Sequence, residues 1–405
     1  MNVEEQKIVL VVDDTPANIQ IVNSILRDTY KIRIATNGAK ALELAAGTPA
    51  PDLILLDVMM PEMDGYEVCT RLKEATGTRD IPVIFLTGQT EIEDETKGFA
   101  VGAVDYIHKP FSPAVVKARV QTHLVLRGMQ KQLERQLLTI RSELETARQI
   151  QLSILPRQIP QLKGLDIAAR YIPMASVAGD FYDFLVVDDQ RIGILIADVS
   201  GHGMPAALIS SMLKIALAAQ GSNSRDPARV LSGLNEALCG KFQGRYITAA
   251  YVLIDTAKHT ICYAGAGHPP LLLMDQSAGT TRQVEENGLF LGYFPQATYS
   301  SVEVPFNEGD WAILYTDGIV EATNTSEEEF GTDRFQLFLE KHHDLSAAKL
   351  VDSLLDELAS WSDPLSGREP EDDITLVALH LNSPESANLL AVPLTEVNVS
   401  SVAIG

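Results

Sequence analysis

Five polar side chains in the N-terminal part of the chain stand where apolar runs end. Asp13 and Asp14 follow the run IVLVV, Asp57 follows LILL, and Thr87 and Lys109 follow two later runs. If these runs are parallel strands, their carboxyl ends meet at one crevice. Three carboxylates at one point repel one another unless a hard divalent cation such as Mg²⁺ binds among them. A lysine and a hydroxyl beside them suit a phosphoryl group, and a carboxylate can itself be the nucleophile that forms an acyl phosphate.

A second set of acidic residues lies in the C-terminal half, beside glycines or next to apolar runs. The motifs are AGDFYDF with Asp180 and Asp183, IADVSGHG with Asp198, YTDGIVEA with Asp317, and EDDITL with Asp372 and Asp373. A single strand-end aspartate is as easily a helix cap or a turn residue. Four such motifs without nearby lysine or arginine are costly unless metals bind them. Two cations about 3.5–4 Å apart could activate water and stabilise a phosphoryl transition state.

The elements that must position the first set alternate between strands and helices. The runs are IVLVVDD, KIRIAT, DLILLD, PVIFLT and DYIHK, and most of them are too continuously apolar for a sheet with one solvent-exposed face. Helical segments separate them, so we expect a five-stranded parallel sheet covered on both sides. This doubly wound α/β domain is assigned to residues 1–113.

Residues 114–160 follow a different pattern. Apolar side chains recur at three-four spacing, Gln151 interrupts them, and no proline falls between Ala114 and Leu155. One long helix or a helical hairpin is expected, with a coiled-coil-like stripe. From Ala114 to Arg157 eight basic residues stand against three glutamates, so this connector is basic. The stripe can pair two copies as a homodimer or pack within one chain, and one seam does not decide between them.

Residues 161–382 contain strands followed by longer helical segments, which is typical of an α+β layered domain. The runs RIGILIADV, YITAAYVLID, HTICYAGAG, WAILYTDG and DITLVALHL are the predicted strands. The helices are predicted over Pro205–Ala219 and Ala347–Ser360. The polar, weakly periodic tail 383–405 is predicted to be disordered.

Composition excludes several classes of function. The 405 residues carry a formal net charge of −22, which argues against a broad nucleic-acid or anionic-membrane surface. Three well-separated cysteines indicate reduced thiols rather than disulfides or zinc. No apolar stretch approaches the ~18 residues of a membrane span, and the N-terminus has no signal-peptide pattern. We therefore expect a cytoplasmic protein.

The N-terminal motifs VVDDTPAN, DLILLDVMMPEMDGYEV, FLTG and DYIHKPF resemble response-regulator receiver domains. The resemblance implies that Asp57 accepts phosphate from a histidine kinase or phosphotransfer protein. It implies further that Mg²⁺ is held by Asp13, Asp14, Asp57 and the main-chain carbonyl of Met59. Thr87 and Lys109 would contact the phosphoryl group, and Tyr106 would be the aromatic side chain that rotates on activation.

The C-terminal motifs resemble the PPM family of metal-dependent protein serine/threonine phosphatases, in its SpoIIE-like branch. ARQIQLSILPRQIP resembles the entry to domains of this branch. The resemblance implies a β-sandwich flanked by helices and two Mn²⁺ or Mg²⁺ ions. Their ligands would be Asp180, Asp198, the main-chain carbonyl of Val199, Asp317 and Asp372, with Asp373 a secondary candidate. Eukaryotic relatives bind the substrate phosphate with an arginine near the start of the domain, and we place no counterpart of it in this chain. Arg170 is the nearest basic residue, and we expect it to be a surface residue on a strand.

Together these resemblances imply a two-component response regulator whose output is a phosphatase. Its implied substrate is a phosphoserine or phosphothreonine on an anti-sigma-factor antagonist, with Asp57 phosphorylation in control. The alternative is a pseudophosphatase adaptor that binds a sigma-factor regulator without hydrolysis. Degenerate adaptors lose metal-ligand aspartates, whereas this chain keeps all four. A DNA-binding output would need a basic recognition helix, and the C-terminal domain offers none. AGDFYD is faintly similar to a diguanylate cyclase signature, but the other three motifs do not fit that activity.

Overall fold

The computed structural model describes residues 6–88, 92–175, 177–242, 244–362 and 371–382. The chain divides into two compact units, Met1–Ile140 and Arg141–Gly405, and each is described by itself. The predicted disorder of the tail 383–405 lies outside the described residues. No helix in the described ranges is long and apolar enough to cross a membrane.

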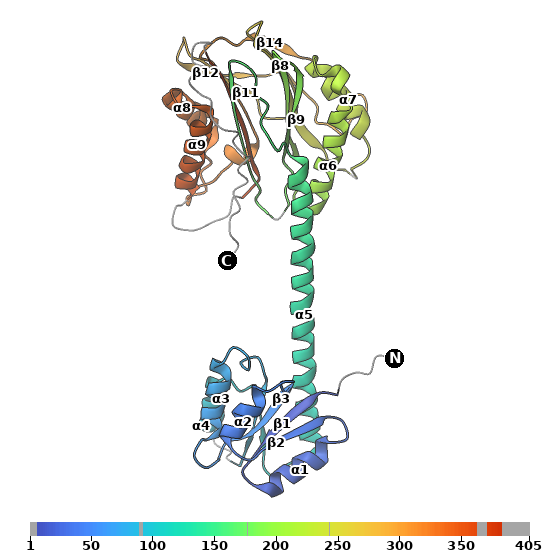
Figure 1. Ribbon diagram of the computed structural model, residues 1–405, viewed down its shortest axis with the longest axis vertical. Coiled ribbons are helices and arrows are strands. Elements are labelled where there is room, and N and C mark those ends of the chain that lie inside the picture. Colours follow the sequence, from blue (N-terminus) through green and yellow to red (C-terminus); the bar gives the residue numbers. More distant parts are fainter. Residues whose placement is uncertain (1–5, 89–91, 176, 243, 363–370, 383–405) are drawn as a thin grey trace. The chain divides into compact units, whose positions relative to one another are not determined.

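The first unit is built on a five-stranded parallel sheet in the order β2-β1-β3-β4-β5, which confirms the doubly wound prediction (Figure 1). The strands are β1 (Ile8–Val12), β2 (Lys31–Ala35), β3 (Leu53–Asp57), β4 (Val83–Thr87) and β5 (Asp105–His108). The helices are α1 (Pro16–Leu26), α2 (Gly38–Ala45), α3 (Gly65–Glu74) and α4 (Ile92–Ala100), followed by α5 (Pro113–Ile154).

Alternating side chains of these strands fill two separate cores. Leu10, Ile54 and Phe85 pack against residues of α2 and α3 on one face of the sheet. Val11 and Leu55, one position further along their strands, pack on the other face against α1 and α5. Successive strand residues point to opposite faces, so a sheet with helices on both sides needs continuously apolar strands.

The second unit is a sandwich of two largely antiparallel sheets. One sheet has the order β13-β10-β9-β8-β7, with β14 paired to β10, and the other has the order β12-β11-β15-β16-β6. The strands of the first sheet are β7 (Phe181–Asp188), β8 (Arg191–Val199), β9 (Ile247–Asp255), β10 (Thr260–Ala266), β13 (Asn287–Gly288) and β14 (Val302–Pro305). Those of the second are β6 (Leu165–Ile172), β11 (Leu271–Asp275), β12 (Thr280–Val284), β15 (Trp311–Tyr315) and β16 (Ile374–Leu381).

Helices cover both outer faces of the sandwich, as the resemblance implied (Figure 1). α6 (Met204–Ala218) and α7 (Pro227–Leu238) pack on the first sheet, and α8 (Gly331–His342) and α9 (Ala347–Ser362) on the second. Two short 3₁₀ turns, η1 (Gly221–Asn223) and η2 (Asp317–Ile319), complete the elements. In β15, Ala312 and Leu314 face the first sheet, whereas Ile313 faces α8 and α9.

The segment 114–160, predicted as a linker, is one helix rather than a hairpin over most of its length. Its first turns belong to the core of the first unit through Val116, Val120 and Leu124. Its last turn and the residue after it, Leu152 and Leu155, pack into the core of the second unit. The unit boundary at Ile140 therefore falls inside the predicted linker.

Candidate functional site

Three carboxylates meet at the carboxyl edge of the parallel sheet. One oxygen from each of Asp13, Asp14 and Asp57 lies within 4.8 Å of the others. Asp13 and Asp57 are buried and Asp14 is exposed. Asp13 and Asp57 stand just after or at the ends of the adjacent strands β1 and β3, which is why residues far apart in sequence come together.

Lys109 provides the positive charge of this pocket. Its Nζ lies 2.9 Å from Asp13 Oδ2 and 3.0 Å from Asp57 Oδ2. Burial raises the pKa of Asp57, the Lys109 hydrogen bond lowers it, and the charge of Asp13 raises it again, leaving a net rise. One ammonium does not balance three carboxylates, so the donor set fits a further divalent cation such as Mg²⁺.

Thr87, Met59 and Tyr106 are the other residues predicted for this pocket. Thr87 is buried at the end of β4, next to β5, and the Met59 amide hydrogen-bonds to Asp57. Tyr106 is buried in β5, with its ring 5.8 Å from that of Phe85 and 5.0 Å from that of Phe99. The structure therefore holds Tyr106 in an inward position.

The second carboxylate group lies where the ends of strands from both sheets of the sandwich meet. Phe181 of β7 pairs with Ala197 of β8, so Asp180 and Asp198 occupy the next pair of positions outward. Asp317 follows β15, and Asp372 precedes β16, its antiparallel neighbour. Strand pairing places these aspartates in two pairs, and packing of the two sheets brings the pairs together from segments nearly two hundred residues apart.

Two threonines of the second sheet tie Asp180 into this site. Thr316 Oγ1 donates a hydrogen bond of 2.8 Å and Thr375 Oγ1 one of 2.6 Å to Asp180 Oδ2. Burial, followed by the charges of Asp198 and Asp373, raises the pKa of Asp180 well above its ordinary value. The charges that act most strongly on Asp180 are therefore negative ones.

Burial and the charges of neighbouring carboxylates also raise the pKa values of Asp198 and Asp317. Burial and then the charges of Asp317 and Asp372 raise the pKa of Asp198 to about 7. Burial and then Asp372 raise the pKa of Asp317. Among the described residues only the Asp13 group brings three carboxylate oxygens within 4.8 Å, so this second cluster is wider. A wider set of carboxylates fits a pair of divalent ions, whose charge would remove the repulsion.

The shape of the site supports the same interpretation at Gly179. A Cβ at this position would lie 2.8 Å from the carbonyl oxygen of Val199 and 3.2 Å from Asp198 Oδ1. Only glycine lets the chain pass this close to two of the proposed ligand atoms. The Val199 carbonyl thus borders the carboxylate cluster, and its role as a metal ligand stays a prediction.

Asp373 has a different set of partners from the other acids. Its Oδ1 accepts the Met174 N–H at 2.8 Å and its Oδ2 accepts the Gly179 N–H at 2.7 Å. Asp373 therefore holds the loop before Asp180, and its part in metal binding stays a prediction.

Some residues of this site were missed by reasoning from sequence. Gln151 is buried and bonds to the backbone of Ala178. Arg245 donates a 2.9 Å hydrogen bond to the carbonyl of Ser200, just after the Val199 position. For Gln151 the signal was its place as a polar interruption of an apolar stripe, whereas nothing in the sequence marks Arg245.

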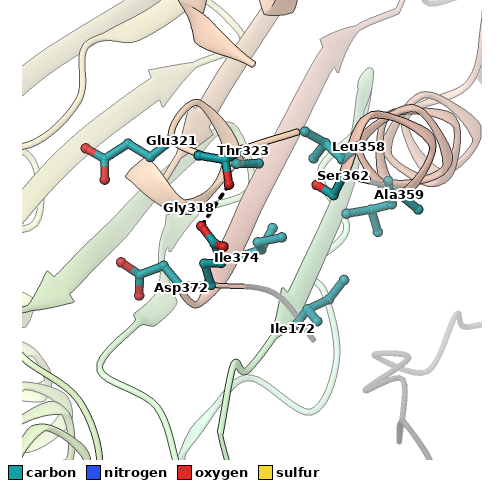
Figure 2. A pocket seen from close by; sticks show the side chains of 12 residues that line it. Ile172, Gly318, Glu321, Thr323, Leu358, Ala359, Ser362, Asp372 and Ile374 are labelled. Carbon is teal, nitrogen blue, oxygen red and sulfur yellow. Dashed lines mark hydrogen bonds between the residues drawn. The ribbon is translucent and has the colours of Figure 1, made fainter. Parts of the chain in front are cut away.

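A pocket of about 300 Å³ opens beside these acids (Figure 2). Ile172, Leu358 and Ile374 form apolar walls, and Asp372 and Glu321 lie at its acidic side. Thr323 donates a 2.9 Å hydrogen bond to Glu371, a further lining residue. Asp372 lines this pocket and also belongs to the carboxylate cluster, so the pocket borders the cluster.

Two family models match the chain. Residues 9–121 match the response regulator receiver domain, and residues 188–382 match Stage II sporulation protein E (SpoIIE).

Among similar proteins, phosphoserine phosphatase RsbU of Bacillus subtilis (strain 168) is 34% identical over 260 residues, covering 64% of this chain and 74% of that protein. A probable cyclic di-GMP phosphodiesterase of Vibrio cholerae is 51% identical over 116 residues, which cover 29% of this chain and 26% of that protein. The SiaA-PP2C domain of Pseudomonas aeruginosa aligns with a TM-score of 0.54 at 25% identity, over 61% of this chain and 98% of that domain.

Proposed function

Because the chain belongs to the SpoIIE-type family of metal-dependent protein serine/threonine phosphatases and carries a receiver domain at its N-terminus, we propose that phosphorylation of Asp57 controls dephosphorylation of a small regulatory phosphoprotein. The phosphate donor is a histidine kinase or a phosphotransfer protein. The proposed substrate is a phosphoserine or phosphothreonine on an anti-sigma-factor antagonist, and the proposed receiver ion is Mg²⁺.

The observation that carries this proposal is the carboxylate cluster at the meeting edge of the two sheets. Asp180, Asp198, Asp317 and Asp372 come from both sheets, and the first three have raised pKa values. Acids arranged this way are unfavourable for the fold alone, which supports a role in binding cations. The adaptor alternative gains no comparable support.

In this proposal the acids act by binding and orienting. Asp180, Asp198, Asp317, Asp372 and the Val199 carbonyl would hold two Mn²⁺ or Mg²⁺ ions. Such a pair supplies activated water and positive charge for the phosphoryl transition state. Thr316 and Thr375 hold the Asp180 carboxylate in place, and Arg245 fixes the turn after Val199.

The pocket beside Asp372 supports a polypeptide substrate. Its apolar walls suit the stem of a long side chain, and its acidic side suits a positive end group. We propose that it takes a lysine or arginine side chain of the phosphoprotein near the phosphorylated residue.

The first test is phosphate release from p-nitrophenyl phosphate with Mn²⁺. Asp317→Asn should lose at least about 100-fold in kcat/KM, since even changes around a metal site often cost 10–100-fold. Asp183→Asn is the matched control, because Asp183 is a buried aspartate of the same motif that pairs with Lys214 at 2.7 Å. Equal turnover in wild type and Asp317→Asn would contradict the proposal. Wild type treated with beryllofluoride gives the direction of control.

The pocket is tested with a phosphoserine peptide that carries a lysine near the phosphorylated residue. Ala359 lines the pocket, so Ala359→Phe should raise KM for the peptide about tenfold and leave p-nitrophenyl phosphate turnover unchanged. Ser360→Phe, on the same helix but outside the pocket, should change neither. A peptide KM that Ala359→Phe leaves unchanged would remove the pocket from substrate binding.

A further inference from the structure

Gln151 carries a buried side-chain amide near the C-terminal end of α5, where adjacent residues of the helix are exposed to solvent. Its side chain is 5% exposed, whereas the adjacent Ile150 is 61% exposed. Burying an amide is unfavourable unless both its ends are hydrogen-bonded. The identity of its partners therefore decides what this residue does.

Both ends of the Gln151 amide bind one residue of the opposite loop. Gln151 Oε1 accepts the Ala178 N–H at 3.1 Å, and Gln151 Nε2 donates to the Ala178 carbonyl at 2.6 Å. Nε2 also lies 3.2 Å from the hydroxyl oxygen of Ser210, a fully buried residue of α6. A side chain that both donates to and accepts from a single residue fixes the position and the orientation of that backbone.

Ala178 leads directly into the carboxylate cluster. Residues 177–180 are all buried, and the next amide, Gly179 N–H, is bound by Asp373. The close approach of Gly179 to Val199 and Asp198 leaves this loop little room on its other side. Gln151 and Asp373 therefore hydrogen-bond to the two successive residues that precede Asp180 in the chain.

We propose that Gln151 is a positioning residue that sets Asp180 for metal binding through the Ala178 backbone. This inference rests on the proposed function, because it takes Asp180 as a metal ligand. Gln151 touches no substrate and acts only through the loop. Loss of its two hydrogen bonds leaves buried backbone groups unpaired, and the loop before Asp180 moves or loosens.

The test uses the full chain with Gln151→Met, which keeps the length of the side chain and removes both hydrogen bonds to Ala178 as well as the contact with Ser210. Gln151→Glu keeps the acceptor and removes the donor. Leu152→Ala is the matched control, because Leu152 contributes apolar packing in the same turn of α5 without a bond to the loop. Gln149→Met is the surface control, since its amide donates to Glu145 on the same helix.

Two readouts separate positioning from packing. The first is the Mn²⁺ activation constant measured with p-nitrophenyl phosphate, together with kcat at saturating Mn²⁺. The second is hydrogen–deuterium exchange of the amides at residues 177–180 in metal-free protein. The second readout needs no turnover and no bound metal.

Gln151→Met should raise the Mn²⁺ activation constant about tenfold or more, which is the range for residues that orient metal ligands. At saturating Mn²⁺ the variant should recover most of the wild-type kcat. The same variant should speed exchange at residues 178–180. Leu152→Ala should lower the melting temperature and leave the activation constant unchanged. Wild-type values for both readouts in Gln151→Met, or an equal rise in Leu152→Ala, would overturn the inference. Absence of Mn²⁺-dependent turnover in wild type would instead contradict the proposed function, and the exchange readout would still decide the role of Gln151.

Discussion

The buried charges of the two units are balanced in different ways. In the receiver, Lys109 lies within 3.0 Å of Asp13 and Asp57, so one divalent ion would complete the charge balance of the three carboxylates. In the carboxylate cluster of the phosphatase, hydroxyl groups of threonines stand in place of ammonium groups. Threonine hydroxyls orient a carboxylate and leave its charge in place for a metal to neutralise. We therefore propose that the second site depends more strongly on bound cations than the first.

His268 gives the phosphatase unit a pH-dependent contribution to stability. Burial lowers its pKa from 6.5 to about 3, and its Nδ1 lies 3.0 Å from the Thr248 hydroxyl oxygen. A histidine with a depressed folded-state pKa stabilises the fold above its unfolded pKa, and this stabilisation is lost as pH falls below 6.5. The loss is at most about 1.4 kcal/mol for each pH unit.

His268→Gln should therefore destabilise the unit at pH 7.5 by about 1 kcal/mol. This difference should fall to near zero by about pH 6 and reverse in sign at pH 5, where wild type has lost about 2 kcal/mol. Urea unfolding of both proteins at pH 7.5, 6 and 5 measures the difference. A difference that stays constant across this range would show that His268 does not titrate as the structure indicates.

Gly98 in α4 determines where Tyr106 lies. A Cβ at residue 98 would come within 2.1 Å of the Tyr106 hydroxyl oxygen and 2.9 Å of a ring atom of Phe85. Gly98→Ala should turn Tyr106 outward or cost the receiver about 1–3 kcal/mol of stability. Thermal unfolding and tyrosine fluorescence with and without beryllofluoride detect either result. Gly77→Ala is the control, because no atom lies within 4 Å of its Cβ position. Matching behaviour of the two variants would contradict this role.

At the residue scale, sequence reasoning found side chains that act through their own chemistry. Asp57 and Asp198 stand in recognisable motifs at strand ends, and the topology of parallel and antiparallel strands then brings them together. Gln151 and Arg245 act through backbone groups of distant loops. A residue of that kind is visible only once the loop it holds has a place in space, so motif reading could not identify it.

At the scale of elements, long runs with clear periodicity were predictable and short ones were not. The five receiver strands were expected from their patterns, and the long helix α5 was one of the two alternatives expected for its segment. In the sandwich, β12 has the burial pattern of an exposed edge strand, and β13 has only two residues. Such segments have no hydrophobic repeat long enough to recognise, and pairing with their neighbours alone defines them.

The helix α5 is the element that belongs to both cores, so its rotational phase should matter for control by Asp57. One alanine inserted after Ser142 turns everything beyond it by 100° relative to the receiver end. We expect this insertion to keep basal turnover, because Gln151 and Leu152 lie beyond it and keep their contacts, and to abolish the response to beryllofluoride. A seven-residue insertion adds almost two full turns and should restore the response. Phosphate release with and without beryllofluoride measures both. A full response in the one-residue variant would exclude this helix as the route of control.

For the whole molecule, the open question posed by the sequence is what covers the apolar stripe of α5. Leu126, Met129, Leu133, Leu137 and Ile140 are between 49% and 63% exposed, so the described residues of their own unit leave about half or more of each side chain uncovered. With the half-buried Leu144 and Ala147 the stripe runs for about three heptads, near the lower limit for a coiled coil. A dimer built on this stripe alone should therefore dissociate on dilution.

Light scattering over a range of protein concentrations tests this directly. We expect the mass of wild type to fall from dimer to monomer as the protein is diluted through the micromolar range. Leu133→Glu combined with Leu137→Glu places like charges at the seam and should give a monomer throughout. Gln136→Glu adds a charge on the exposed helix outside the stripe and should keep the wild-type curve. A monomer at every concentration for wild type would mean that two copies do not pair through α5, and the receiver would then control the phosphatase within a single chain.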